Sequence, residues 1–438
     1  MAGSQFLDKV REAGVVGAGG AGFPTHVKLD AKVDWLIANA AECEPLLHAD
    51  AAVLEHEGDK VIQGMIAAAE QVGATRITIA IKRKHTELIE ALQAQVKGTP
   101  VELCELNDTY PAGDEHVMVY EVTGRIVPEG GIPLQAGCVV SNVETYLNVA
   151  GALDDEPVTM KYVTVNGAVT EPQTFIAPIG ISLEALIRQA GGPTINDYVV
   201  VTGGCMMGRI GSVDESLTKT VNAVLVFPPD HEVVSKTKLT MTAAETQGSA
   251  ACCQCWDCTK VCPRYLLGHN LQPHLTMRAM AYGKPENSDA ITTAWLCCEC
   301  GTCEMYCPIR LSPRRVYQGI KAMLKEAGVK NPHTNADLQA RETRPYRLVP
   351  SNRLRARLNV ERYNVDAPLV ETPLQTAEVE IPLRMQVGAP SQPIVVVGDV
   401  VKAGQLIARI PEGALGANIH ASISGKVTAV DGYIAIEA

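Results

Sequence analysis

Two cysteine runs of identical spacing constrain this chain more than any other feature of its sequence. The first lies in ACCQCWDCTKVCPRYLL and the second in CCECGTCEMYCPIR, and both follow C-x2-C-x2-C-x3-C-P. In bacterial ferredoxins this run holds a cubane [4Fe-4S] cluster, and the fourth cysteine of each run binds the other cluster. A pair of zinc sites is the alternative, but zinc motifs usually have two CxxC pairs separated by a longer loop. The spacing therefore predicts two iron–sulfur clusters.

The crossed arrangement assigns each thiolate to one cluster. One cluster takes Cys252, Cys255, Cys258 and Cys307. The other takes Cys297, Cys300, Cys303 and Cys262. Cys253 and Cys298 each follow a first ligand directly, so we expect them to point away from the clusters and to be small packing residues that do not bind iron.

The remainder of the chain is large enough for several domains. Its 438 residues are 46% hydrophobic, which suffices for about two to four domains with their own cores. We expect no transmembrane segment, because no run of 18 or more residues is apolar, and no secretory signal peptide. The net charge of −11 argues against nucleic-acid binding. A cytoplasmic protein with fourteen reduced cysteines and no disulfide framework is therefore expected.

A glycine-rich stretch near the N-terminus, GVVGAGGAGFPTHVKL at residues 14–29, favours a phosphate site. It follows an expected first helix that begins after Ser4 and ends at Gly14. Loop glycines let backbone N–H groups approach a phosphate without a side-chain clash. The glycines do not form the dinucleotide pattern G-x-G-x-x-G, and a plain tight turn is the alternative interpretation.

The chain resembles a known flavoprotein superfamily in four segments that occur in the same order. They are GAGGAGFPTHVK, NAAECEP at 39–45, YPAGDEHVMVYEVTGRIVPEGG at 110–131 and VSNVET at 140–145. These segments are similar to the flavin domain of the NADH-oxidising subunit of respiratory complex I. They are more similar still to the Rnf complex C subunits and to the PduS-type cobalamin reductases of propanediol-utilising microcompartments. The resemblance implies a Rossmann-like domain at residues 1–155 that binds FMN and NADH.

The resemblance also implies which residues form the flavin site. It places the FMN phosphate on the glycine loop and near Lys28, and the flavin and nicotinamide beside two acidic segments. Glu42 and Glu44 are the catalytic candidates. The full predicted cofactor set is Gly17, Gly19, Gly20, Gly22, Phe23, Lys28, Asn39, Glu42, Glu44, Gly113, Asp114, Glu115, Asn142 and Thr145.

Simpler interpretations of some of these residues stay open. From the residues alone, Glu42 and Glu44 fit a solvated loop, and Asn142 fits a helix cap. The chain also departs from complex I, which has arginine where this loop has Ala18, and aromatic residues where this chain continues as KLDAKV. These departures weaken the case for NADH more than the case for FMN.

Three further domains and a linker are predicted after the flavin domain. Residues 156–235 contain a strand, an Asn-Gly turn, a helix and a strand, and resemble the SLBB β-grasp domain of these families. Residues 240–330 carry the cluster motifs among helices. Residues 331–374 are an arginine-rich linker with seven arginines between 341 and 362. Residues 375–438 have short β-runs, and GDVVKAGQ and ASISGKV resemble a barrel-sandwich hybrid domain. The expected fold is a multidomain α/β chain.

The predicted function is electron transfer from NADH through FMN and two [4Fe-4S] clusters to cob(II)alamin. The resemblance implies a partner that is a cobalamin adenosyltransferase or other corrinoid protein, with microcompartment shell proteins as further partners. It implies a location in the cytoplasm within a bacterial microcompartment. The C-terminal position of the barrel-sandwich domain favours the reductase, because Rnf C subunits place it first. The alternatives are a membrane-complex subunit linking ferredoxin and NAD, and a non-enzymatic iron–sulfur relay.

Overall fold

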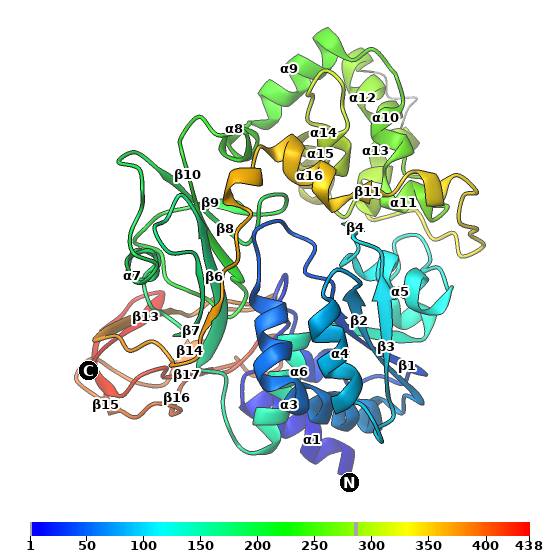
Figure 1. Cartoon of the computed structure of the whole chain (residues 1–438). Coiled ribbons are helices and arrows are strands. Elements are labelled where there is room, and N and C mark those ends of the chain that lie inside the picture. The colour runs from blue at the N-terminus through cyan, green and yellow to red at the C-terminus, as the bar shows by residue number, and fades with distance from the viewer. Residues whose placement is uncertain (1, 284–287) are drawn as a thin grey trace.

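The computed structural model describes residues 2–283 and 288–438, and they form the predicted multidomain α/β fold (Figure 1). The flavin-type domain lies at the N-terminal end, with the β-grasp domain beside it and the helical cysteine domain above both. The C-terminal β domain lies below the β-grasp domain. None of the described helices is long and apolar enough to cross a membrane.

The N-terminal domain is built on a parallel four-stranded sheet in the order β3-β2-β1-β5. Alternate residues of β1 face opposite layers: Leu36 and Ala38 pack with α3 and α6, and Trp35 and Ile37 pack with α5. Coverage on both faces explains why its strands are nearly continuous apolar runs. The strands are β1 (Trp35–Ala40), β2 (Arg76–Lys82), β3 (Val101–Leu106) and β5 (Cys138–Asn142). The helices are α1 (Ala2–Glu12), α2 (Thr25–Lys28), α3 (Ala49–Val72), α4 (Thr86–Gln95), α5 (Glu115–Thr123) and α6 (Val143–Leu153).

The β-grasp domain contains a six-stranded mixed sheet in the order β12-β7-β6-β10-β8-β9. The predicted turn at Asn166-Gly167 is wrong: both residues lie in β6 and pair with Leu225 and Val226 of β10, and the chain turns only after them, over residues 168–172. Ser182 caps the helix by accepting from Ala185 N. The elements are β6 (Met160–Gly167), β7 (Gln173–Pro178), α7 (Leu183–Gln189), β8 (Val199–Thr202), β9 (Arg209–Gly211) and β10 (Ala223–Phe227).

The cysteine domain is helical, with a small core formed by residues such as Met277, Tyr317 and Ile320. The third cysteine of each run lies in a short helix, α10 or α14, so both runs are folded tightly. The helices are α8 (Glu232–Lys238), α9 (Met241–Ala251), α10 (Asp257–Lys260), α11 (Pro263–Leu266), α12 (Pro273–Tyr282), α13 (Ser288–Thr292), α14 (Thr302–Met305) and α15 (Pro313–Glu326).

The C-terminal domain pairs two small antiparallel sheets, as the barrel-sandwich pattern predicts. Its apolar residues share one core with the N-terminal domain. Gly22 of the glycine loop touches it closely, since a Cβ there would lie 3.0 Å from Met385 O. The strands are β13 (Glu378–Pro382), β14 (Gln392–Pro393), β15 (Val400–Val401), β16 (Leu406–Arg409), β17 (Ile419–His420), β18 (Gly425–Val430) and β19 (Tyr433–Glu437).

The arginine-rich segment has more regular structure than the linker that the sequence predicted. Its second half, residues 349–370, is a packed strap: β11 (Val349–Pro350) pairs with β4 (Thr109–Tyr110), and β12 (Leu369–Val370) pairs with β7. Between these strands, α16 (Ser351–Leu358) buries Leu354 and Leu358. The leucines are four residues apart and so share one helix face, which the many arginines obscured. The strap therefore ties the flavin-type and β-grasp domains together.

Candidate functional site

The two cysteine runs adopt the same unusual backbone conformation. Gln254 and Glu299 occupy equivalent positions and have φ values of 56° and 59°. Trp256 and Gly301 are also equivalent, with φ values of 71° and 77°. A left-handed residue is uncommon outside glycine, and here it recurs twice per run at matching places. The repeated sequence spacing is therefore also a repeated three-dimensional loop.

The outer thiol set consists of Cys252, Cys255, Cys258 and Cys307, and these four cysteines line one cavity. Burial raises the pKa of the Cys258 thiol to about 12, and the thiols of the other three cysteines contribute to the rise. Cys307 thus joins the first run, as the crossed pattern requires. Cys253 lines the same cavity from an exposed position.

The inner thiol set consists of Cys262, Cys297, Cys300 and Cys303. Burial raises the pKa of the Cys262 thiol to about 12, and neighbouring Cys298 and Cys297 add to it. Burial likewise raises the pKa of Cys303, with Cys297 and Cys262 among the neighbouring groups that contribute. Among the described residues, no three His, Cys, Asp or Glu side chains converge tightly enough for a single metal ion. Soft thiolates at this spacing fit iron–sulfur clusters.

The inner thiol set adjoins the flavin-type domain. The Tyr110 hydroxyl donates to the carbonyl of Cys300 at 2.7 Å, and Cys43 packs in the same core as Cys300. Arg264, two residues after Cys262, forms a paired contact with the Asp114 carboxylate, in which Nη2 lies 3.0 Å from Oδ2. Both side chains of this ion pair are about nine-tenths buried. The contact holds the inner thiols against the segments that the sequence assigned to the flavin.

The outer thiol set lies toward the protein surface. Cys253 and Cys255 are exposed. Trp256 is 46% exposed, and Ile309, two residues after Cys307, is 43% exposed. The His274 ring lies 4.3 Å from the Trp256 ring and is held by Thr259, 2.8 Å from its Nδ1. The two thiol sets therefore differ in surroundings: one faces the flavin-type domain and the other faces solvent.

The glycine loop lies against the end of β5, as the predicted phosphate site requires. Ala18 N donates to the Thr145 hydroxyl at 3.0 Å. A Cβ on Gly19 would lie 2.9 Å from the Asn142 amide nitrogen, whereas a Cβ on Gly20 would have no neighbour within 4 Å. Gly19 is therefore packed against Asn142, whereas Gly20 borders open space. Open space beside loop backbone is what a phosphate-binding loop requires.

Asn142 links the loop to two carboxylates. Its Oδ1 caps α6 by accepting from Glu144 N at 2.9 Å, so the helix-cap interpretation is correct for this atom. Its Nδ2 donates to Asp50 Oδ1 at 2.8 Å, and Glu42 Oε1 accepts from Asp50 N at 2.9 Å. Burial, with the nearby Asp50 charge, raises the pKa of Glu42 to about 8. The Glu42 carboxylate is therefore bonded to the start of α3 and is not part of a solvated loop.

Other predicted cofactor residues form a second group across the site. Asn39 Nδ2 donates to the carbonyl of Gly113 at 2.9 Å. Lys28 Nζ donates to Glu115 Oε1 at 2.8 Å. Gly17 N donates to the carbonyl of Phe23 and closes the loop. These contacts bring the separate segments of the predicted site to one end of the parallel sheet.

Two predicted residues turn toward other domains. The Glu44 carboxylate accepts from Met206 N at 2.8 Å and Met207 N at 3.0 Å, both in the β-grasp domain. Burial raises the pKa of Glu44 to about 7. Asp114 pairs with Arg264 and also caps α5 through His116 N and Val117 N. Both residues therefore join domains in this structure, and their predicted roles toward a cofactor stay predictions.

Sequence reasoning missed three residues that organise this region. Asp50 lies in the first turn of α3, where an acidic residue indicates only the start of a helix. Arg264 directly follows Pro263 of the first cysteine run, but its partner is 150 residues away. Lys161 is fully buried against Glu144, in an ion pair between the β-grasp domain and α6. Only the tertiary fold brings these charges together.

The residues present fit a flavin phosphate and two clusters. The loop glycines leave backbone N–H groups beside open space at Gly20. The eight cysteines form two sets on matching loops. The site therefore combines a nucleotide-type cradle with two sets of thiols, one against the flavin-type domain and one toward solvent.

Comparison with protein families gives four matches along the chain. They are the Nuo51 FMN-binding domain at residues 10–151, the SLBB domain at 162–210, the 4Fe-4S dicluster domain at 251–312 and the RnfC barrel sandwich hybrid domain at 361–438. Their order agrees with the domain order predicted from the sequence.

Curated proteins match over most of the chain. The cobalamin reductases PduS of Citrobacter freundii and Salmonella typhimurium are each 40% identical to it, over 97% and 98% of this chain and 94% and 95% of theirs. The C subunit of the Na(+)-translocating ferredoxin:NAD(+) oxidoreductase complex of Acetobacterium woodii is 35% identical over 64% of this chain and 62% of its own. In fold, the chain is similar to a chain of NAD+-reducing [NiFe]-hydrogenase, with a TM-score of 0.51, 21% identity, and coverage of 76% of this chain and 64% of that one.

Proposed function

Since the chain belongs to the family of PduS cobalamin reductases and is an oxidoreductase, we propose that it passes electrons from NADH, via FMN and two [4Fe-4S] clusters, to cob(II)alamin on a partner protein. The observation that carries this proposal is the contact between the flavin-type domain and the inner thiol set. Tyr110, Cys43 and Asp114 all belong to segments of the predicted flavin site, and all three reach the inner cysteines or Arg264.

In this proposal the glycine loop, Asn142 and Asn39 hold FMN. When bound, FMN supports both two-electron and one-electron steps, which is what coupling a hydride donor to one-electron carriers requires. The loop backbone binds its phosphate, and the closely packed Asn142 fixes the loop against α6. The raised pKa of Glu42 means that it holds its proton more strongly than an ordinary carboxyl, so it is the residue suited to donate a hydrogen bond at neutral pH.

The placement of the two thiol sets supports a direction of transfer. The inner thiol set adjoins the flavin-type domain, and Cys303 of this set lies near enough to Cys258 of the outer set for that thiol to contribute to its raised pKa. The outer thiol set lies beside exposed Cys255 and Trp256. An acceptor on another protein would therefore dock at the outer set. We propose a cobalamin adenosyltransferase or another corrinoid protein as that acceptor, and a bacterial microcompartment as the location.

An anaerobic titration of the purified holoprotein with NADH tests the proposal. Visible absorbance follows the flavin band, and electron paramagnetic resonance follows the clusters. We expect NADH to bleach the flavin band and then to produce reduced-cluster signals. Cob(II)alamin added next should oxidise the clusters and yield cob(I)alamin.

The control is the same titration with dithionite, which bypasses the flavin site. If dithionite reduces the clusters while NADH changes neither flavin nor clusters, the NADH step is wrong and a one-electron relay takes its place. A third outcome is that NADH reduces the clusters and that the clusters exchange electrons with ferredoxin but not with cob(II)alamin. This outcome would favour the Rnf-type function.

A further inference from the structure

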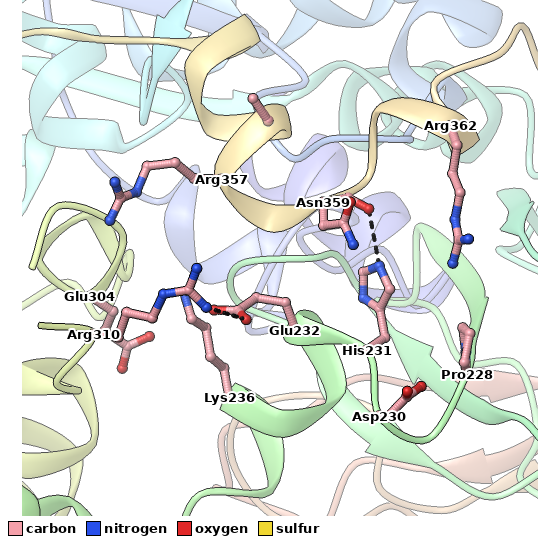
Figure 2. Close-up of a pocket in the computed structure, with 11 residues that line it drawn as sticks. Pro228, Asp230, His231, Glu232, Lys236, Glu304, Arg310, Arg357, Asn359 and Arg362 are labelled. Carbon is pink, nitrogen blue, oxygen red and sulfur yellow. Dashed lines mark hydrogen bonds and ion pairs between the residues drawn. The ribbon is translucent and has the colours of Figure 1, made fainter. Parts of the chain in front are cut away.

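A cavity of about 580 Å³ opens where three parts of the chain meet, apart from the predicted flavin site and separate from the cavity of the outer thiol set (Figure 2). One wall is the segment after β10 of the β-grasp domain, residues 228–236, which includes the start of α8. The second is the cysteine domain at residues 304–310, and the third is the end of α16 and the turn after it, residues 356–362. Its volume lies within the range of small-molecule sites, roughly 300–1,000 Å³.

Positive charge collects at one end of this cavity. Figure 2 shows Arg357, Arg310 and Lys236 around the same side. Glu232 is shared, at 3.2 Å from Arg310 Nη1 and 3.4 Å from Lys236 Nζ. In the part of the chain that the structure describes, no carboxylate lies within ion-pair distance of Arg357.

The acidic Glu304 on the same wall does not balance this charge. Its carboxylate accepts from the Ser312 hydroxyl and lies 3.4 Å from Arg314 Nε. Both of these partners are buried in the cysteine domain. Of the three cations at this end, Arg310 and Lys236 share the Glu232 carboxylate and Arg357 pairs with no carboxylate of the described residues, so an anion would complete the charge balance.

Neighbouring groups hold the arginine and the far wall in place. The Arg357 guanidinium lies 5.9 Å from the Tyr306 ring centre, and its Nη2 donates to the carbonyl of Cys307 at 3.4 Å. The His231 ring accepts from Val233 N through Nδ1, so Nε2 carries the proton that it donates to Asn359 O at 3.1 Å. The His231 side chain on this wall is therefore neutral, and the charge of a ligand would be recognised by Arg357, Arg310 and Lys236.

We infer that this cavity binds a small phosphate-bearing anion, with its phosphate held by Arg357, Arg310 and Lys236. Guanidinium groups match phosphate oxygens in a planar, two-point geometry, and lysine adds a compact charge. The inference goes beyond the proposed function, because no part of the electron path requires this cavity. Since Arg357 also contacts the Cys307 carbonyl, the bound anion lies beside the segment that supplies one outer thiol.

Isothermal titration calorimetry of the anaerobic holoprotein tests this binding. The probes are inorganic phosphate and glycerol 3-phosphate, with glycerol as the uncharged control. We expect both phosphates to bind and glycerol not to bind. Arg357→Gln should weaken binding by about tenfold to a hundredfold, the usual effect of losing a charged hydrogen-bonding partner. Glu232→Gln should strengthen binding, because it removes the carboxylate that competes for two of the cations.

The matched control is Arg353→Gln, which removes the same charge from an exposed position on α16 that does not line the cavity. It should bind phosphate as the unaltered protein does. Tighter binding of glycerol 3-phosphate than of phosphate would assign an organic phosphate, and the reverse would assign free phosphate. No phosphate binding, or equal losses in the Arg353 and Arg357 variants, would overturn the inference. Reduction by NADH is measured separately, so failure here leaves the proposed function unaffected.

Discussion

The Asp114–Arg264 ion pair should be the main electrostatic attachment between the flavin-type domain and the inner thiol set. Both side chains are about nine-tenths buried. Removing one partner of a buried pair typically costs about 3–5 kcal/mol, because the other charge stays buried without compensation. Asp114→Asn should show this cost alone, since asparagine also caps a helix well. Asp114→Ala should cost about 1 kcal/mol more, because it also loses the cap of α5.

Thermal unfolding of the anaerobic holoprotein measures this effect. For a domain of this size, about 3–5 kcal/mol corresponds to a fall in melting temperature of roughly 10 °C. Glu102→Gln is the matched control, because it breaks an exposed ion pair with Arg76 in the same domain and should cost at most about 1 kcal/mol. The double variant Asp114→Asn with Arg264→Met should recover most of the loss, since it leaves no buried charge. If Asp114→Asn melts like the control, or if the double variant is no better than the single one, the pair does not hold the domains together.

Three further predictions use other parts of the chain. Cys307→Ser should remove the electron paramagnetic resonance signal of the outer cluster, and Cys262→Ser should remove that of the inner cluster. Each variant should retain half of the iron. If each variant loses the signal of the other cluster instead, the crossed arrangement is wrong. Gly19→Ala and Gly20→Ala should both lower the FMN content, the first because its Cβ would meet Asn142 and the second because its Cβ would enter the open space assigned to the phosphate; an unchanged FMN content in the purified Gly20→Ala variant would be evidence against the loop as the phosphate cradle. Burial lowers the pKa of Lys219 to about 7, so the folded state binds fewer protons than the unfolded state between about pH 7 and 10 and stability should rise with pH across that window. Lys219→Met should show a flatter melting temperature between about pH 7 and 9, and an unchanged slope would rule out that role for the lysine.

Much of the fold was predictable because its signals are local in sequence. The cysteine spacing and the short β-runs at the C-terminus each depend on neighbours within a few residues. The order of the domains followed from the resemblance, and the family matches confirm it. The pairing of Cys307 with the first run also needed only the ferredoxin rule.

The contacts between domains could not be predicted from the sequence. Glu44 lies in a predicted flavin segment, but its carboxylate binds backbone N–H groups more than 160 residues away. Asp114 meets Arg264 in the same way. The strap was misjudged because seven arginines hide two leucines at helical spacing. Such partners are selected by packing, and no local periodicity encodes them.

The strap, residues 349–370, fixes where the chain re-enters the flavin-type domain after the cysteine domain. The cysteine domain leaves the β-grasp domain after β10, and the chain returns at β11 to pair with β4 of the flavin-type domain. Ser351 at the start of α16 reinforces this return, donating to Asp108 at 2.7 Å and accepting from the buried Lys82 at 3.2 Å. The cysteine domain is thus an insertion whose two ends are both anchored to the unit formed by the flavin-type and β-grasp domains. The cysteine domain could therefore be replaced, between the end of β10 and the start of β11, by another electron-transfer domain with different redox properties. The flavin-type and β-grasp domains would stay intact.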